Sequence, residues 1–186
     1  MKKTGIENIR REIRHKDRDI VRLLNERARL SLEVGKIKGQ EGIGGYDPAQ
    51  EMRVLNEIAA INEGPLVVET LGHIYREILS SSRALQAPLA VACLGPEGSF
   101  AHLAALDRFG GSARVAPQES IGAVFDAAEK QKADLGVVPL ENSVEGPVRV
   151  TLERLIATPL SIRGEIFLRI SQDRKSTRLN SVTDVS

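Results

Sequence analysis

Three cationic side chains lie on the apolar seam of a long helical segment near the start of the sequence. Residues 6–38 repeat every seven positions, and their two seam rows read Ile6, Ile13, Ile20, Arg27, Val34 and Arg10, Asp17, Leu24, Ser31, Lys38. For one such residue, a long side chain that reaches past the apolar stripe into solvent is the simpler interpretation. Three on one seam favour another interpretation, because a buried cation is costly without a partner. The pattern therefore predicts a site for a small anionic ligand.

The spacing of these cations decides which of them can share a ligand. Arg27 and Lys38 are about three turns apart on one helix face, roughly 16 Å along the axis, so both side chains can converge on one small molecule. Arg10 lies about 25 Å before Arg27, which is too far for it to reach the same molecule within one chain. It can instead reach a ligand that is held by a second copy.

The composition restricts the class of protein. The chain has 186 residues, of which 41% are hydrophobic, so it can bury one core or two small ones. Its single cysteine, Cys93, lies in an apolar run and is expected to be a buried thiol, and its three histidines lack metal-ligand spacing. With no signal peptide and no apolar stretch long enough to cross a bilayer, we expect a soluble, cytoplasmic protein with no metal site and no membrane partner. The basic segment 1–40 leaves a nucleic-acid binder open, although aromatic residues make up only 3% of the chain.

Helix-boundary residues divide the first half of the chain into three helices. The glycine-rich stretch 39–45 is expected to end the first helix. Asp47 is expected to be the N-cap of a short second helix, with Pro48 as its first residue. A third helix follows and places Ser82 and Gln86 on one face, because they are four residues apart. Taken singly, Ser82 is a small residue that a helix tolerates, and Gln86 is a solvated helix end.

After Pro88 the pattern changes to short β-branched runs separated by glycine-rich turns and helices. Four strands are expected, at residues 89–95, 112–117, 134–140 and 165–170. Their alternation with helices predicts an α/β domain with a largely parallel sheet. In such sheets ligands bind beyond the carboxyl ends of the strands, which is where the segments GPEGSF and ENSVEG fall.

Four motifs in the first half resemble the all-helical chorismate mutase class, namely RRE near Arg10, ERARLSLEVGKIK from Glu26, YDPAQE from Tyr46 and REILSSSRALQ from Arg76. In the second half, LGPEGSFAH, ADLGVVPLENSVEGPV and TLERL resemble the start of prephenate dehydratase. Over about residues 5–172 the chain therefore resembles the bifunctional chorismate mutase/prephenate dehydratases of phenylalanine biosynthesis. The resemblance implies chorismate mutase (isomerase) activity, with prephenate dehydratase (lyase) as the second activity of the family.

The resemblance also implies a multidomain fold. Residues 1–88 would form an all-α, three-helix chorismate mutase domain, and residues 89–172 a partial α/β prephenate dehydratase lobe of the periplasmic-binding-protein-like kind. A first helix about 50 Å long cannot be covered by two shorter ones, so we expect an intertwined homodimer. Residues 173–186 lack periodicity and do not continue the family pattern, and we interpret them as a non-native tail.

Each matching residue takes a role from the resemblance. Arg27 and Arg10 of the partner subunit would clamp the carboxylates of chorismate. Lys38 would contact a carboxylate and the ether oxygen, to which Gln86 would also donate, so the implied catalytic residues are Lys38, Gln86 and Arg27. The further substrate-binding residues are Asp47 and Glu51 for the ring hydroxyl and Ser82 for a carboxylate.

The implied reaction explains why these residue types suffice. Rearrangement of chorismate to prephenate is pericyclic and needs no proton transfer, nucleophile or cofactor. The enzyme has to hold a compact dianion in its reactive shape and stabilise the charge that develops as the ether bond breaks. Cations and one amide can do both.

The chain departs from the family pattern at two places. Gln50 stands where the family usually has arginine, which predicts weaker binding or a slower reaction unless Arg53 takes over. The rest of the dehydratase and the family's phenylalanine-binding regulatory domain do not follow the match. Since one lobe cannot close around a substrate, we expect no dehydratase activity. The residues that match the prephenate cleft of the first lobe are Ser99, Asn142, Ser143 and Glu145.

Two other interpretations stay open at this point. A non-catalytic helical module that binds a ligand or regulates would bind a chorismate analogue without turnover, and the missing charge at Gln50 favours it. A helical nucleic-acid binder would associate with duplexes in a strongly salt-dependent way and would not need Ser82 or Gln86. Because the two halves resemble enzymes of consecutive steps in one pathway, we expect no nucleic-acid partner.

Overall fold

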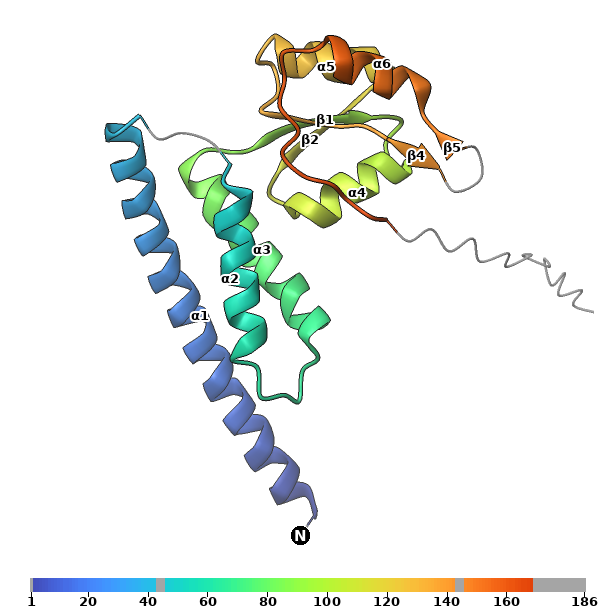
Figure 1. Ribbon diagram of the computed structural model, residues 1–186. Coiled ribbons are helices and arrows are strands. Elements are labelled where there is room, and N and C mark those ends of the chain that lie inside the picture. The colour runs from blue at the N-terminus through green and yellow to red at the C-terminus, as the bar shows by residue number, and fades with distance from the viewer. Residues whose placement is uncertain (1, 43–45, 143–145, 169–186) are drawn as a thin grey trace, which may run out of the picture.

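The computed structural model describes residues 2–42, 46–142 and 146–168, which form a helical part followed by an α/β part (Figure 1). The helical part consists of α1 (Lys2–Gln40), α2 (Pro48–Ala60) and α3 (Val68–Gln86). The α/β part consists, in chain order, of β1 (Ala90–Leu94), α4 (Phe100–Phe109), β2 (Arg114–Gln118), α5 (Ile121–Glu129), β3 (Leu135–Val137), β4 (Glu141–Asn142), β5 (Gly146–Pro147) and α6 (Arg149–Ala157). Three helices followed by an α/β part is the organisation predicted from the sequence.

Side-chain caps start α2 and α5. Asp47 lies just before α2, and its Oδ1 accepts a hydrogen bond from the backbone N–H of Gln50 at 2.9 Å. Pro48 follows in the first turn, where its missing N–H has no intrahelical partner to lose. Ser120 caps α5 in the same way and accepts from the N–H of Ala123 at 3.1 Å. The predicted cap at Asp47 is confirmed.

α1 is longer than either helix of the pair α2 and α3. It packs on α3, and in Figure 1 its N-terminal end runs past the connection between α2 and α3. Ile6, Ile13 and Ile20, the apolar members of one seam row, are 54, 54 and 53% exposed. A single chain therefore leaves this part of the seam uncovered.

The main sheet is parallel, as predicted, and its strand order is β2-β1-β3. Its central strand β1 is apolar throughout because both of its faces are covered. Val91 and Cys93 contact the core that contains Phe109 of α4, whereas Ala92 contacts Val124 of α5 on the other face. Figure 1 shows α4 and α5 on opposite sides of the sheet. Cys93 is fully buried, as expected, and this burial raises the pKa of its thiol.

Two predictions for the α/β part need correction. Residues 165–168 do not form the expected fourth strand, and residues 169–170 of that segment lie outside the described residues. A strand needs a hydrogen-bonded neighbour, and residues 165–168 pair with no strand of the described sheets. Phe167 is 87% exposed. The segment ENSVEG is also more than a loop, because β4 and β5 pair in antiparallel fashion on either side of residues 143–145, which are not described.

Candidate active site

The first contact between predicted site residues joins α1 to α3. Arg27 is partly buried, and its guanidinium donates a hydrogen bond to Ser82 Oγ at 2.8 Å. Ser82 is 7% exposed and donates in turn to the carbonyl of Ile78, one turn earlier on α3, at 2.7 Å. The Arg27 side chain therefore points towards α3, and the Ser82 hydroxyl beside it is fixed by its own hydrogen bond.

One turn further along α1, Gln86 lies against the same helix face. Its Nε2 donates to Ser31 Oγ at 2.6 Å. Gly35 allows this close approach, since a Cβ built at this glycine would lie 2.7 Å from Cγ of Gln86. Lys38 follows one turn after Gly35 and is partly buried. The α1 face that meets α3 therefore carries, in order along the helix, Arg27, the contact with Gln86 and Lys38. One cation lies on each side of the Gln86 amide.

The start of α2 carries the next two predicted residues. Asp47 is exposed and caps α2, so one of its oxygens is occupied by a backbone N–H. Glu51 is largely buried and forms an ion pair with the guanidinium of Arg83 on α3. The carboxylate predicted to bind a ring hydroxyl is thus held against α3 rather than pointing into solvent.

Arg53, the candidate replacement for the family arginine, is bonded to a residue of its own helix. Arg53 donates from Nε and from its terminal nitrogen to Oε1 of Gln50, at 3.1 and 2.7 Å. Both side chains are exposed on one face of α2, three residues apart. In this arrangement the two residues satisfy each other.

Arg10 stands apart from the group in the same chain. Its side chain is 63% exposed and pairs with Glu7, one turn earlier, at 2.9 Å. Because α1 is one continuous helix, Arg10 lies about 25 Å along the axis from Arg27. The separation expected from the sequence is preserved.

Arg83 and Tyr46 were not singled out from the sequence, yet both lie beside Glu51. The guanidinium of Arg83 is 5.2 Å from the centre of the Tyr46 ring, and it also donates to the carbonyl of Phe109 at 2.6 Å. Burial and then the charge of Glu51 raise the pKa of Tyr46 to about 12. The partners of Arg83, Glu51 and Phe109, are 32 and 26 residues away in the sequence, so no local pattern could have indicated its role.

Of the predicted prephenate residues, Ser99 lies in the α/β part. Ser99 caps α4, accepting from the N–H of His102 at 3.2 Å, and its hydroxyl donates to the carbonyl of Leu94 at 2.8 Å. It therefore lies at the carboxyl end of β1, next to an open cavity lined by Gly95, Pro96, Pro117, Gln118 and Glu119. Asn142 belongs to β4, but its side chain is outside the described part of the structure, as are the whole residues Ser143 and Glu145.

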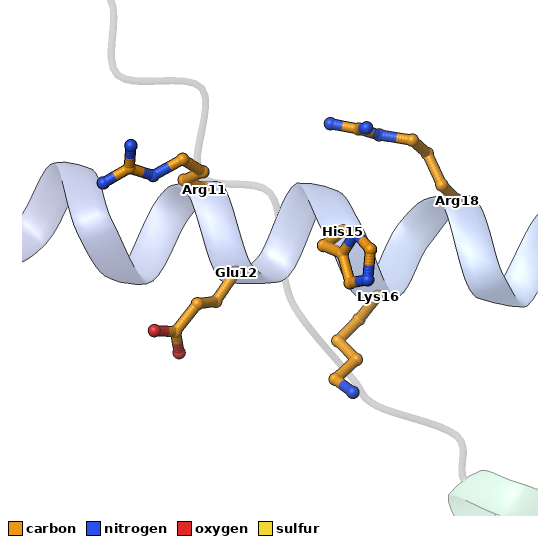
Figure 2. Close-up of a pocket in the computed structure, with 5 residues that line it drawn as sticks. All are labelled: Arg11, Glu12, His15, Lys16 and Arg18. Carbon is orange, nitrogen blue, oxygen red and sulfur yellow. The ribbon is translucent and has the colours of Figure 1, made fainter.

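Another hollow follows the outside of α1 and does not coincide with the predicted site. Figure 2 shows its lining side chains, all of which come from that one helix: Arg11, Glu12, His15, Lys16 and Arg18. No second element described here closes over them. The predicted site is better defined by the contacts between α1 and α3.

The described segments offer neither a metal-binding cluster nor a helix that could span a membrane. Across residues 2–42, 46–142 and 146–168, no three His, Cys, Asp or Glu side chains gather in a way that could hold a metal ion. None of the helices given above is long and apolar enough to cross a membrane.

Comparison with known families accounts for both halves of the chain. The model of the prephenate dehydratase family matches residues 91–185, and that of chorismate mutase type II matches residues 9–87. The chain belongs to these two families. The predicted family and the order of helical mutase domain and partial α/β dehydratase lobe are therefore confirmed.

Relatives with both domains are similar along most of this chain. The bifunctional chorismate mutase/prephenate dehydratase of Aquifex aeolicus is 40% identical over 170 residues, which are 89% of this chain and 47% of that protein. The protein of the same name from Neisseria gonorrhoeae is 41% identical over 154 residues, 83% of this chain and 42% of that protein. A solved chorismate mutase from Thermus thermophilus is 37% identical, with 44% of this chain and 92% of that chain covered and a TM-score of 0.43. The chain spans about half the length of the curated bifunctional relatives it matches.

Proposed function

We propose that this chain is a chorismate mutase, which converts chorismate to prephenate in phenylalanine biosynthesis. The observation that carries the proposal is the convergence of Arg27, Ser82 and Gln86 across the contact of α1 with α3, with Lys38 following on α1. These groups supply cations, a hydroxyl and an amide, and a compact dianion with an ether oxygen can use all three kinds. Membership of the chorismate mutase type II family supports the same substrate.

The residues of this site act by binding and electrostatics. Arg27, held next to Ser82, would bind a carboxylate. Lys38 would bind a carboxylate and the ether oxygen, and Gln86 would donate an amide N–H to that oxygen. Because charge develops on the ether oxygen as its bond to the ring breaks, donors already aimed at it stabilise the transition state more than the ground state. Asp47 and Glu51 at the start of α2 would accept from the ring hydroxyl.

The proposal includes a homodimer with two shared sites. The apolar seam of α1 is uncovered in one chain, and Arg10 on that part of α1 cannot reach the Arg27 group of its own chain. A second copy laid along the seam would cover it and bring Arg10 of the partner subunit to the ligand. A cytoplasmic location belongs to the same proposal.

For the dehydratase half we propose that the 186-residue polypeptide has no activity by itself. Ser99 lies next to an open cavity whose lining, in the described residues, comes from the end of β2 and from the residues that follow β1 and β2. Such a site cannot exclude water or surround prephenate. Release of phenylpyruvate from added prephenate measures this directly, and any release above the uncatalysed rate would contradict the proposal.

The loss of chorismate absorbance with purified protein tests the mutase, with prephenate identified as the product. Lys38→Ala should reduce turnover by about 10²-fold or more, because one preorganised donor of this type contributes about 3–4 kcal/mol. Lys36→Ala removes an exposed cation from the same helix and serves as the matched control. A folded wild-type chain without turnover would refute the proposal. Binding of a chorismate analogue by that chain would then favour the alternative of a non-catalytic ligand-binding module, which the neutral residue Gln50 motivates.

A further inference from the structure

A group of hydrogen bonds joins α3 of the helical part to the turn after α4 in the α/β part. Glu77, Ser80 and Arg83 follow one another at three-residue intervals on one side of α3, and they face the turn after α4, residues 109–112. We name these seven residues the interdomain joint.

Hydrogen bonds from three side chains hold the interdomain joint. Both carboxylate oxygens of Glu77 accept from the N–H of Gly111, at 3.1 and 3.2 Å. Ser80, only 1% exposed, accepts from the N–H of Ser112 at 3.3 Å. Arg83 donates to the carbonyl of Phe109 at 2.6 Å. The side chains of α3 thus satisfy backbone groups at the C-terminal end of α4 and in the turn that follows it.

Close packing at Gly110 makes the joint sensitive to shape. Gly110 has a φ of 77°, a region that residues with a Cβ rarely adopt. A Cβ placed there would lie 2.5 Å from Cβ and 2.7 Å from Oγ of Ser80. Any side chain at position 110 would therefore force the turn away from α3.

Arg83 connects this joint to the proposed mutase site. Its guanidinium pairs with Glu51 at the start of α2, donates to the Phe109 carbonyl at the end of α4, and lies over the Tyr46 ring. The Tyr46 ring contacts Phe109 edge-on, at 5.5 Å between ring centres, so the two parts of the molecule also meet through apolar surface. Arg83 is 18% and Glu51 13% exposed, which protects the pair from screening by water. A guanidinium can satisfy a carboxylate and a carbonyl together because its donors point in several fixed directions.

We propose that Arg83 is a positioning residue for the mutase reaction and that the α/β part holds it in place. The inference rests on the proposed function, since it concerns the placement of Glu51 for the ring hydroxyl of chorismate. Through Arg83, the C-terminal end of α4 fixes the orientation of Glu51. The second domain then has an effect on the first site without contributing a residue that touches the substrate.

Steady-state kinetics of four variants test this coupling. Arg83→Met should raise KM for chorismate by about tenfold, with a smaller change in kcat, since the hydroxyl contact serves binding and no bond breaks there. Arg83→Lys keeps a cation for Glu51 and should recover part of the loss. Gly110→Ala alters no residue of the helical part, yet should raise KM in the same direction by several-fold. Gly98→Ala is its matched control, because Gly98 has a φ of 80° in the same part of the molecule and nothing lies within 4 Å of its Cβ position.

The outcomes separate this inference from the proposed function. Turnover by the wild type that is lost in Lys38→Ala, together with unchanged KM in a folded Arg83→Met variant, would overturn the role of Arg83 alone. Equal kinetics for Gly110→Ala and Gly98→Ala would overturn the part played by the second domain. Absence of turnover in the wild type would overturn both proposals. Circular dichroism of each variant establishes that it is folded, and if Arg83→Met does not fold, Arg83→Lys and Gly110→Ala decide the question.

Discussion

Replacing Gly35 with alanine should slow the proposed mutase reaction while leaving the fold almost as stable as before. Gly35 lies in the interior of α1, where alanine is favoured over glycine by about 1 kcal/mol. The new Cβ would lie 2.7 Å from Cγ of Gln86 and 3.0 Å from its Cδ and Oε1. All three atoms belong to a flexible side chain, so α1 and α3 can stay in place while the Gln86 side chain rotates away.

Two magnitudes determine the expected result. Rotation of Gln86 breaks its 2.6 Å hydrogen bond to Ser31, a loss of about 1 kcal/mol that offsets the gain in helix propensity. The free energy of unfolding should therefore change by less than about 1 kcal/mol. The same rotation removes the amide that is proposed to donate to the ether oxygen, and one such donor contributes about 3–4 kcal/mol to the transition state. We expect kcat to fall by about 10²-fold or more.

The assay combines urea unfolding with the loss of chorismate absorbance. Gly39→Ala is the matched control, because Gly39 is also in α1 but has no atom within 4 Å of its Cβ position. It should leave kcat unchanged. A folded Gly35→Ala variant with kcat within about twofold of the wild type would refute the role given to Gln86. An equal fall in kcat for Gly35→Ala and Gly39→Ala would instead show that the substitutions act through α1 itself.

Three further predictions concern the dimer, the departure from the family pattern and pH. Chains that carry Arg10→Ala and chains that carry Lys38→Ala should each be inactive alone, but a mixture of the two should recover about a quarter of wild-type turnover. Half of the reassembled dimers contain one chain of each kind, and each of these dimers has one intact site. No recovery would contradict shared sites. Gln50→Arg should raise kcat/KM about tenfold in the chorismate assay, since it returns a cation near a dianionic ligand, and unchanged kinetics would show that position 50 does not matter. Because burial raises the pKa of Tyr46 to about 12 in the folded chain, the unfolded chain loses this proton first as the pH rises past about 10. The free energy of unfolding should therefore fall between about pH 10 and pH 12. Urea unfolding across that range should show a shallower fall for Tyr46→Phe, and parallel curves for the two proteins would contradict the assignment.

The helices and most strands could be predicted because their signals are local. The heptad rows of α1 and the Asp47–Pro48 cap each depend on residues within one or two turns. The expected strand at 165–170 was wrong for residues 165–168 because an apolar run specifies a strand only when another strand pairs with it. Phe167 lies on the surface instead.

The site could be predicted only in part, for a related reason. The seam cations Arg27 and Lys38 were visible in the heptad pattern, because they stand where apolar residues are expected. Arg83 interrupts no pattern, and its partners Glu51 and Phe109 are 32 and 26 residues away. Its role depends on how α2, α3 and α4 pack, which no single segment encodes.

The side chains of Arg10 and Arg27 differ in how firmly their surroundings fix them, and this difference supports a site shared between chains. Arg27 is partly buried and already directed at Ser82, so it is organised before a ligand arrives. Arg10 is exposed and bound to Glu7 on its own helix, and an exposed pair of this kind contributes little stability in water. Arg10 can therefore exchange Glu7 for a substrate carboxylate at small cost. The uncovered isoleucines Ile6 and Ile13 flank Arg10 on the same stretch of α1, so the surface that would bury them in a second chain is the surface that would deliver the cation. In the proposed homodimer, dimer formation and completion of the active site would be one event.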